Sequence, residues 1–376
     1  MSLSIRKGTS QSRDPVVAAL ELFKALDQPD IKFAVFYCAS DFDLPALAAE
    51  LRKHFGDTAL IGCTTAGEIT PAGYLAGSLT GFSLASPKLD VAVRMLPLDP
   101  FDSQKADESV RNLLLGMNER DGIPPNATDT FGFMLIDGLA MQEEMVVSCI
   151  HSSLMGIELI GGSAADDTRF AATWLYYQGA FHRNVALLAL VRTDRPFMAF
   201  RTQHFVKSEQ RMVVTRADPA RRIVYEINGR PAGREFARLV GMNMDQLTPL
   251  IFATHPVVVR VGGQYFVRSI AKVNEDESLT FFCAIDEGIV LTIAKGVDMV
   301  ENLRDAFAKV HDAIGTPALV LGCDCILRRL ETEREGIKDE IGKIFAENNV
   351  IGFATYGEQY NSMHVNQTFT GIAIGA

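Results

Sequence analysis

The chain has 376 residues, 48% of them apolar, so it can bury a substantial core, and its length predicts two or three domains. Its formal net charge of −10 repels the negatively charged phosphate backbone of nucleic acids, and no dense basic cluster offsets that charge locally. We therefore do not expect nucleic acid to be a partner. Residues 1–14 lack the apolar run of a signal peptide, and the longest apolar run, residues 185–191, is too short to cross a bilayer. We therefore expect no membrane insertion and a cytoplasmic location, with which six cysteines lacking disulfide-framework spacing agree.

An apolar strand that runs into a loop of small residues recurs three times. The copies are residues 60–69, 159–168 and 350–359. Their glycines, Gly62, Gly161 and Gly352, are 99 and 191 residues apart, which is close to one and two steps of a single period. A period of this length predicts duplicated α/β subdomains, with a fourth unit, degenerate or replaced, between the second and third copies.

The neighbours of each copy follow the same order. A strand and a helix precede the three copies, at residues 33–39 and 44–55, at 131–137 and 141–155, and at 318–322 and 326–348. Strands follow the first copy at residues 79–84 and 91–96, and the second at 173–177 and 185–191. The fold class is therefore α/β, with repeat-built mixed sheets and helices on one side, and with the third unit a partial copy.

The central region has a different pattern of predicted secondary structure. Residues 212–218 and 222–228 read as a β-hairpin joined by an Asp-Pro turn, and a helix follows at residues 233–240. Further strands cover residues 256–268 and 279–294, broken by the acidic turn 274–278. This change predicts a domain boundary within residues 195–222.

Four segments together resemble the FIST sensory domain. They are Ile-Gly-Cys-Thr-Thr-Ala-Gly-Glu at residues 61–68, Gly-Gly-Ser-Ala-Ala-Asp at 161–166, the block at 214–232, and the terminal block at 356–368. The resemblance extends from about residue 31 to residue 370 and implies two halves, an N-like domain at residues 30–222 and a C-like domain at 223–370. It also implies a sensor and not an enzyme.

A chain made of this domain alone is similar to the nitric-oxide-sensing haem proteins of the family, the NosP group. That similarity implies a non-covalent haem b whose iron binds nitric oxide. It also implies that the protein regulates a partner histidine kinase in two-component signalling of the biofilm type. No Cys-x-x-Cys-His is present, which excludes covalent c-type attachment. His204 ends a strand rich in Phe and Met, and we expect it to ligate the iron.

The strand-end loops are the expected ligand pocket, because repetition brings strand ends to one cleft between the halves. Its expected lining residues are Cys63, Thr64, Thr65, Glu68, Glu358 and His364. Asp166 is the carboxylate expected at the corresponding position of the second loop. The remaining histidines are not expected to be ligands. His54, His151 and His311 fall in amphipathic helices and are expected to be solvated or capping residues, His182 to be an exposed turn residue, and His255, before a proline, to be structural.

Alternatives remain open. A FIST sensor of another small ligand, such as an amino acid, has the same sequence features. Cys323 and Cys325, with Cys63, are candidates for a metal or an iron-sulfur cluster, although a Cys-x-Cys pair without a second pair is a weak signal and buried inert thiols explain these cysteines better. A hydrolase or transferase using Cys63 or Thr64 is the enzymatic alternative, but the chain has no nucleotide-loop, metalloprotease or esterase motif. A homo-oligomer is also left open.

Overall fold

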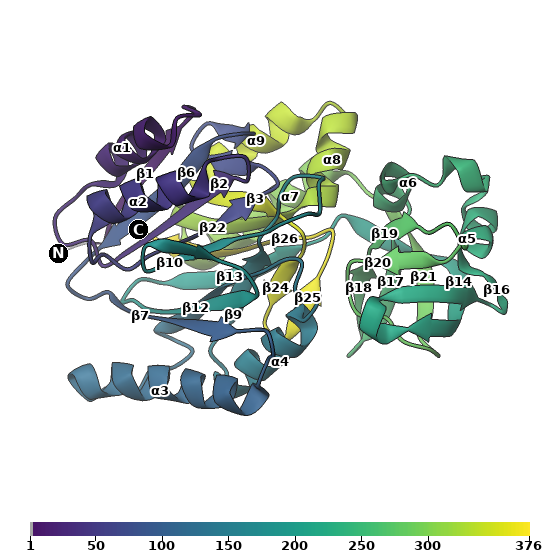
Figure 1. The fold of residues 1–376 in the computed structure, drawn as a ribbon, viewed down its shortest axis with the longest axis horizontal. Coiled ribbons are helices and arrows are strands. Elements are labelled where there is room, and N and C mark those ends of the chain that lie inside the picture. The colour runs from purple at the N-terminus through teal and green to yellow at the C-terminus, as the bar shows by residue number, and fades with distance from the viewer. Residues whose placement is uncertain (1–2) are drawn as a thin grey trace.

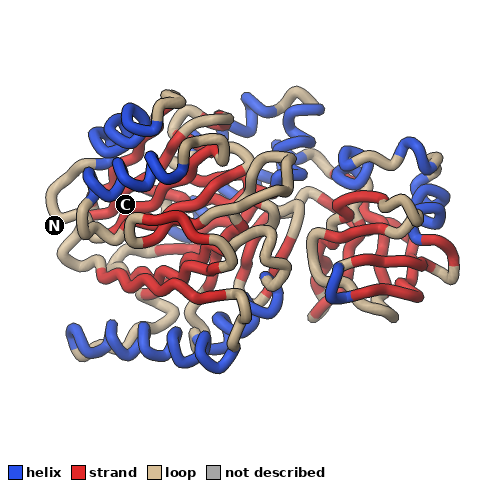
Figure 2. Tube along the Cα trace, viewed as in Figure 1, coloured by secondary structure: helices blue, strands red, loops and turns tan. Residues whose placement is uncertain are grey.

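The computed structural model describes residues 3–376 as a large repeat core with a smaller lobe at one end (Figures 1 and 2). The core consists of three units with one order of elements: strand, helix, strand, helix, strand, short hairpin and final strand. This arrangement confirms the α/β class with mixed sheets. It also confirms that the segments around Gly62 and Gly161 have the same topology.

The first unit comprises β1 (Ser4–Ser10), α1 (Pro15–Leu26), β2 (Phe33–Ala39), α2 (Leu44–Phe55), β3 (Leu60–Thr65), β4 (Glu68–Thr70), β5 (Gly73–Leu75) and β6 (Leu79–Ala85). The side chain of Asp14 accepts hydrogen bonds from the backbone N–H groups of Val16 and Val17, and Pro15 fits the first helical turn, so α1 begins there. Every residue of β2 is buried because both faces of its sheet are covered, which explains its continuous apolar sequence.

The second unit comprises β7 (Asp90–Pro97), α3 (Ser103–Asp121), β8 (Thr130–Ile136), α4 (Glu143–Ser153), β9 (Leu159–Ser163), β10 (Leu175–Tyr177), β11 (Ala180–His182) and β12 (Val185–Arg192). The strand expected at residues 91–96 was assigned to the end of the first unit. It is β7, and it begins the second unit, because it pairs with β12 and not with β6.

The third unit comprises β13 (Phe197–Thr202), α7 (Met299–Ile314), β22 (Pro317–Cys325), α8 (Ile326–Arg334), α9 (Lys338–Glu347), β23 (Val350–Thr355), β24 (Glu358–Tyr360), β25 (Met363–Val365) and β26 (Phe369–Gly375). It is a complete copy, not the partial one that we expected. The single helix expected at residues 326–348 is wrong: it is two helices, separated where Gly336 adopts a φ of +70° that helical backbone does not allow.

The units exchange their hairpins. Hairpin β4–β5 of the first unit pairs with β23 of the third, β10–β11 of the second with β3 of the first, and β24–β25 of the third with β9 of the second. Each of the three core sheets therefore contains four strands of one unit and a hairpin of another. Because every unit gives a hairpin and receives one, the three units form a closed ring around a pseudo-threefold axis.

The inner faces of the three core sheets pack on one another and form a common hydrophobic core. Val35 and Tyr37 of β2, Leu135 of β8, and Leu321 and Cys323 of β22 meet there, all with at most 1% of their surface exposed. The helices cover the outer faces, α1 and α2 on the first sheet, α3 and α4 on the second, and α7 and α9 on the third. This layering brings the three strand-end loops together on the axis.

The lobe, residues 205–296, is inserted into the third unit between β13 and α7 (Figure 1). It comprises β14 (Phe205–Asp218), η1 (Pro219–Arg221), β15 (Ile223–Ile227), β16 (Arg230–Pro231), α5 (Ala232–Val240), η2 (Met244–Gln246), α6 (Pro249–Thr254), β17 (Val257–Val261), β18 (Gln264–Arg268), β19 (Ile270–Val273), β20 (Leu279–Phe281) and β21 (Val290–Gly296). Its sheet is antiparallel and encloses a separate apolar core, to which Phe236 of α5 and Phe252 of α6 contribute.

The lobe explains the repeat spacing. Removing its 92 residues leaves 99 between Gly161 and Gly352, the same spacing as between Gly62 and Gly161. The interval in which we expected a degenerate or replaced fourth unit holds this lobe, whose antiparallel sheet does not have the repeated order of elements. The division expected between residues 222 and 223 falls between β14 and β15, which pair within the sheet of the lobe.

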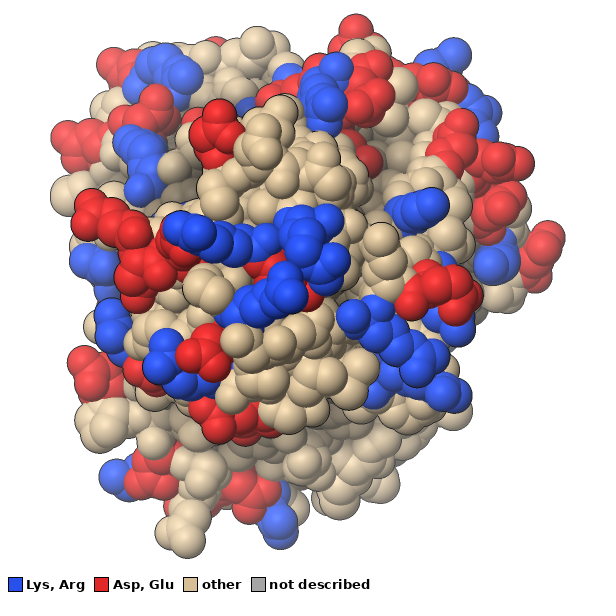
Figure 3. Space-filling model, turned by 90° about the vertical axis from the view of Figure 1, so that its right-hand side faces the viewer, with Lys and Arg blue, Asp and Glu red and all other residues tan. Residues whose placement is uncertain are grey.

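Charged side chains of both signs are spread over the face that the lobe presents, among uncharged residues (Figure 3). Lys and Arg side chains form patches across the middle of this face, with Asp and Glu side chains beside them. On the lobe, Arg234 pairs with Glu277 at 2.6 Å and Arg238 with Glu235 at 2.7 Å, so part of the basic charge is locally neutralised. No helix within residues 3–376 combines the length and apolar character needed to cross a membrane.

Candidate functional site

The three strand-end loops interlock through backbone hydrogen bonds. The N–H of Ala66 donates to the carbonyl of Ala354, and the N–H of Ala165 donates to the carbonyl of Thr64, both at 2.9 Å. Ala66, Ala165 and Tyr356 occupy equivalent positions in the three loops and pack in one cluster. The repeated motif is therefore the joint between units, which explains its small residues.

Buried carboxylates hold the hairpins to the strands that follow. Glu68 accepts hydrogen bonds from the hydroxyl of Thr65 at 2.6 Å and from the N–H of Ser78 at 2.9 Å. Glu358 accepts the corresponding bond from the N–H of Thr368 at 3.2 Å. Burial raises the pKa of both carboxyl groups, that of Glu358 strongly, against the opposing effect of these hydrogen bonds.

Asp166 is not the counterpart of these two glutamates, as we had expected. The second unit has a longer loop, and the strand register places Leu175 at the equivalent position. Asp166 instead accepts hydrogen bonds from the N–H groups of Ala171 and Ala172, both at 2.8 Å, and from the hydroxyl of Tyr356. Its carboxylate orders the longer loop.

A pocket of about 140 Å³ opens at the strand ends of the first unit, and we call it the strand-end pocket. All three units contribute to it. Its charged and hydroxyl-bearing lining residues are Arg13, Ser40, Asp41, Thr65, Glu68, Asp167, Arg169 and Arg329. A site outside the carboxyl ends of strands is the usual ligand position in α/β sheets.

Opposite charges lie side by side in the strand-end pocket. Arg13 donates two hydrogen bonds to Asp41, at 2.8 and 2.9 Å, and Arg169 donates to the hydroxyl of Ser40. Arg329 of α8 lies 3.6 Å from Asp167 and donates to Glu333 at 3.1 Å. The pocket thus presents guanidinium donors and carboxylate acceptors within one small volume.

Two glycines allow the arginines to approach. Gly67 has a φ of +126°, and a Cβ atom there would lie 2.5 Å from Nη1 of Arg329. Gly77 has a φ of +74°, and a Cβ atom there would lie 1.9 Å from Nη2 of Arg13. Any other residue would both strain the backbone and displace a guanidinium.

Only part of the expected ligand pocket lines this site. Thr65 and Glu68 do, whereas Cys63, Thr64, Glu358 and His364 do not. The hydroxyl of Thr64 accepts a hydrogen bond from the N–H of Trp174 at 3.1 Å, and Cys63 lies in the central core.

The cysteines are arranged as structural residues. Cys63, Cys323 and Cys325 are buried, and desolvation raises the pKa of each thiol well above its usual value, which disfavours the thiolate that attacks substrates or binds metals. Within residues 3–376, no three His, Cys, Asp or Glu side chains are grouped so as to hold a metal ion. An iron-sulfur cluster and a Cys63 nucleophile therefore have no support in this arrangement.

His204 lies in the segment between β13 and the lobe, and both of its ring nitrogens have partners. Nδ1 lies 2.8 Å from Nη1 of Arg328, and Nε2 lies 2.9 Å from a carboxylate oxygen of Glu331. Arg328 also donates to Asp324 at 2.7 Å, and Asp324 accepts from the hydroxyl of Tyr74. Burial lowers the pKa of His204, against the opposing effect of Glu331.

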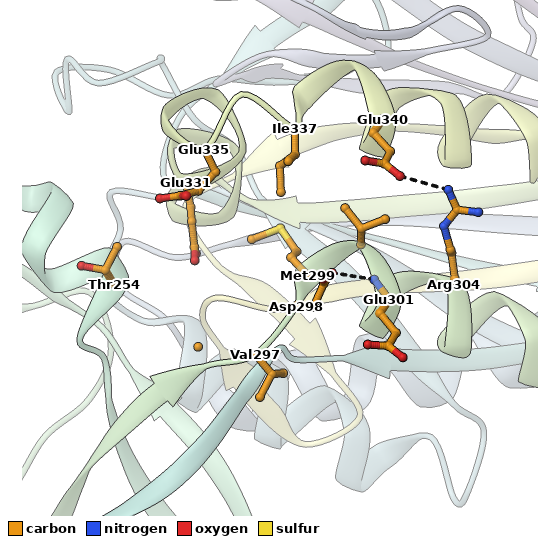
Figure 4. A pocket seen from close by; sticks show the side chains of 12 residues that line it. Thr254, Val297, Asp298, Met299, Glu301, Arg304, Glu331, Glu335, Ile337 and Glu340 are labelled. Atoms are coloured by element: carbon orange, nitrogen blue, oxygen red, sulfur yellow. Dashed lines mark hydrogen bonds and ion pairs between the residues drawn. The ribbon is translucent and has the colours of Figure 1, made fainter.

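A larger pocket of about 730 Å³, which we call the junction pocket, lies where the lobe meets α7, α8 and α9 (Figure 4). Glu331 lines it, so it adjoins His204. Its carboxylates include Glu301, Glu335 and Glu340, the last paired with Arg304 at 3.1 Å. This lining is strongly acidic.

These residues do not fit haem. An axial histidine needs a free ring nitrogen and an apolar slot, whereas His204 has both nitrogens engaged and charged neighbours on each side. The acidic lining of the junction pocket would also disfavour an anionic group such as haem.

Sequence reasoning missed Arg13, Arg169 and Arg329. They are far apart in the chain and lie outside the repeated motif. The available signal was the glycine pattern, because Gly67 and Gly77 leave room for two of these guanidinium groups.

Comparison with known proteins agrees with the two expected halves. The FIST N domain matches residues 32–230, and the FIST C domain matches residues 232–361. The chain is 22% identical, over 363 residues, to the uncharacterized protein MJ1623 of Methanocaldococcus jannaschii, covering 86% of this chain and 69% of that protein. A solved structure titled "Cyanuric acid hydrolase: evolutionary innovation by structural concatenation" aligns over 100% of both chains at 8% identity, with a TM-score of 0.37. Because the two domain matches together cover most of its length, this chain belongs to the FIST family, whose domains are associated with sensing small ligands.

Proposed function

We propose that this protein senses a small zwitterionic metabolite, a free α-amino acid, that binds in the strand-end pocket. The observation that supports this proposal is the meeting of three arginines and several carboxylates from all three units in a volume of about 140 Å³. This volume is below the roughly 300 Å³ at which pockets for drug-sized molecules begin, so it selects a small ligand.

Each end of an amino acid has a complement in the pocket. The ligand carboxylate pairs with Arg329 and Arg169, since guanidinium groups bind carboxylates through two parallel hydrogen bonds. The ligand ammonium pairs with Asp41 or Asp167. A ligand with only one of these charges engages only one of the two sets of side chains.

Ligand binding in the strand-end pocket can change the relative positions of the three units. Arg169 belongs to the long loop of the second unit, Arg13 to the first unit, and Arg329 to α8 of the third. A ligand that contacts all three favours the arrangement in which they are close, and it shifts the population only in proportion to its preference for that arrangement. A sensory role of this kind needs no catalytic residue in the pocket.

Haem-based sensing of nitric oxide is not part of this proposal, because the surroundings of His204 do not fit haem. A partner histidine kinase remains a proposal that a pull-down with the ligand-bound protein tests.

The test is thermal unfolding of the full chain with each of the twenty common L-amino acids. A ligand at about 100 times its Kd stabilises the folded state by about 2.7 kcal/mol, which raises Tm by several degrees. Arg169→Gln is the first variant, because Arg169 is exposed and we expect its replacement to leave the fold intact. It should abolish the shift, as should Arg329→Gln.

The matched control is Arg304→Gln, which removes an arginine from the junction pocket and should leave the shift unchanged. Stabilisation that survives both Arg169→Gln and Arg329→Gln would place the ligand elsewhere. No shift with any of the twenty amino acids would refute the ligand class.

A further inference from the structure

The second unit departs from the repeat at the residue before its hairpin. The strand pairings place Trp174, Gly67 and Gly357 at equivalent positions, each one residue before the first strand of its hairpin. At the two glycines neighbouring side chains fill the space: a Cβ atom would lie 2.5 Å from Nη1 of Arg329 at Gly67 and 2.2 Å from Cε1 of His364 at Gly357. The repeat does not require a tryptophan here, so Trp174 needs an explanation specific to the second unit.

Backbone hydrogen bonds fix Trp174 at the end of β3. Its N–H donates to the hydroxyl of Thr64 at 3.1 Å, and its carbonyl accepts from the N–H of Thr64 at 3.0 Å. Thr65, the next residue of β3, lines the strand-end pocket. The guanidinium carbon of Arg183 lies 5.5 Å from the centroid of the indole ring, and this attraction favours one orientation of the half-buried ring. These contacts hold Trp174 in place one residue along β3 from the strand-end pocket.

Trp174 lines an apolar cavity of about 560 Å³, which we call the side pocket. The rest of its apolar lining comes from the segment that leads into α2 and from hairpin β10–β11, and it includes Phe42, Leu44, Pro45, Ala180 and Phe181. Asp43 also lines the side pocket, but its carboxylate is engaged as the cap of α2, where it accepts a hydrogen bond from the N–H of Ala46 at 3.1 Å. A cavity of this size and lining fits a bulky apolar group.

The side pocket adjoins the strand-end pocket at Ser40. Ser40 lines both cavities, and its hydroxyl accepts a hydrogen bond from Arg169, one of the arginines of the strand-end pocket. Strand β2 ends at Ala39, so Asp41 of the strand-end pocket and Phe42 of the side pocket follow in one loop. A charged cavity for a small head group and an apolar cavity for a bulky group therefore share a boundary residue.

We propose that the side pocket holds the side chain of the bound amino acid and makes the protein selective for large apolar side chains, above all aromatic ones. This inference rests on the function proposed above, in which the strand-end pocket binds the α-carboxylate and α-ammonium groups. The ligand side chain passes Ser40 and contacts the ring of Trp174. Aromatic rings attract one another in offset and edge-on arrangements, and the side pocket offers three of them, Phe42, Trp174 and Phe181.

Other classes of amino acid gain less from the side pocket. The methyl group of L-alanine leaves the cavity unfilled, and a charged side chain loses its hydration against an apolar wall. A difference of one methylene group in an apolar pocket already changes discrimination by about tenfold or more. Because an aromatic side chain is much larger than a methyl group, the preference for L-phenylalanine over L-alanine should be at least about tenfold.

The experiment measures the Kd values of L-phenylalanine, L-leucine, L-alanine and L-aspartate for the full chain by isothermal titration calorimetry. We expect L-phenylalanine to bind most tightly, L-leucine next, and L-alanine and L-aspartate at least about tenfold more weakly than L-phenylalanine. Binding of L-phenylalanine should also change the fluorescence of Trp174, the single tryptophan of the chain, because its side chain lines the side pocket.

Two variants test the side pocket directly. Trp174→Ala removes an aromatic wall and should bring the Kd ratio of L-alanine to L-phenylalanine from about ten or more to near one. Ala180→Phe is the second variant, in case Trp174→Ala fails to fold; it fills the cavity from an exposed position on β11 and should lower the ratio similarly. Tyr225→Ala is the matched control, because Tyr225 of the lobe is also half-buried beneath an arginine, Arg216, at 5.2 Å. It should leave the ratio unchanged.

The outcomes separate this inference from the proposed function. A preference for L-phenylalanine over L-alanine of less than about tenfold would overturn the role of the side pocket, even where Arg169→Gln weakens both ligands and so supports the strand-end pocket. A full preference that persists in both Trp174→Ala and Ala180→Phe would overturn it too, because the ligand side chain would then lie elsewhere. If no amino acid binds at all, the proposed function fails and this inference fails with it.

Discussion

The buried pair of Asp324 and Arg328 should be one of the most sensitive points of the repeat core. Both side chains are completely buried, and Nε of Arg328 donates to Asp324 at 2.7 Å. Burial by itself would lower the pKa of Arg328, but Asp324 raises it overall, so the guanidinium is charged in the folded protein. Asp324→Ala leaves that charge without its carboxylate, and breaking one side of a buried pair costs about 3–5 kcal/mol of unfolding free energy.

The pair can be tested as a double-mutant cycle in guanidinium chloride. Fluorescence of the single tryptophan, Trp174, reports on the repeat core, because the lobe has none. Asp324→Ala and Arg328→Met should each destabilise strongly. The double variant should lose less than their sum, with a coupling of about 1–3 kcal/mol.

A surface pair is the control for this cycle. Arg304 and Glu340 are 59% and 49% exposed, and Arg304→Met should cost about 1 kcal/mol or less. If Asp324→Ala costs no more than this control, or if the two core substitutions are additive, Asp324 and Arg328 do not act as an ion pair and our reasoning is wrong.

Three further predictions concern the loops and the buried titratable groups. Gly67→Ala should destabilise the protein by about 1–3 kcal/mol and weaken amino-acid binding, because it strains the backbone and displaces Arg329; equal Kd values from calorimetry would contradict this. His204 and His364 have lowered pKa values in the folded state, so these two residues bind more protons in the unfolded chain and their contribution to stability should fall as pH drops below about 6.5; the natural chain should therefore lose stability relative to His364→Gln when both are unfolded at a series of decreasing pH values. Burial raises the pKa of Glu358, so its contribution is present in acid and lost as pH rises; Glu358→Gln should therefore raise Tm at neutral pH, and an unchanged or lower Tm would refute this.

Local sequence patterns determined much of this fold. The three strand-loop motifs, the helix from Leu44 to Phe55 and the hairpin that opens the lobe follow from apolar periodicity and turn residues, which act between near neighbours in the chain. The two family halves follow from the same motifs. The single helix expected at residues 326–348 was wrong because its break depends on the backbone conformation at Gly336.

The tertiary structure decided the site. The exchange of hairpins, the replacement of an expected carboxylate by Leu175, and the meeting of Arg13, Arg169 and Arg329 all depend on strand register between units. His204 looked like a free ligand at the end of an apolar strand, yet α8 supplies partners for both of its nitrogens. Local sequence patterns encode which residues are buried and which residues form turns. They do not encode which distant side chains meet, because that follows from how whole sheets and helices pack.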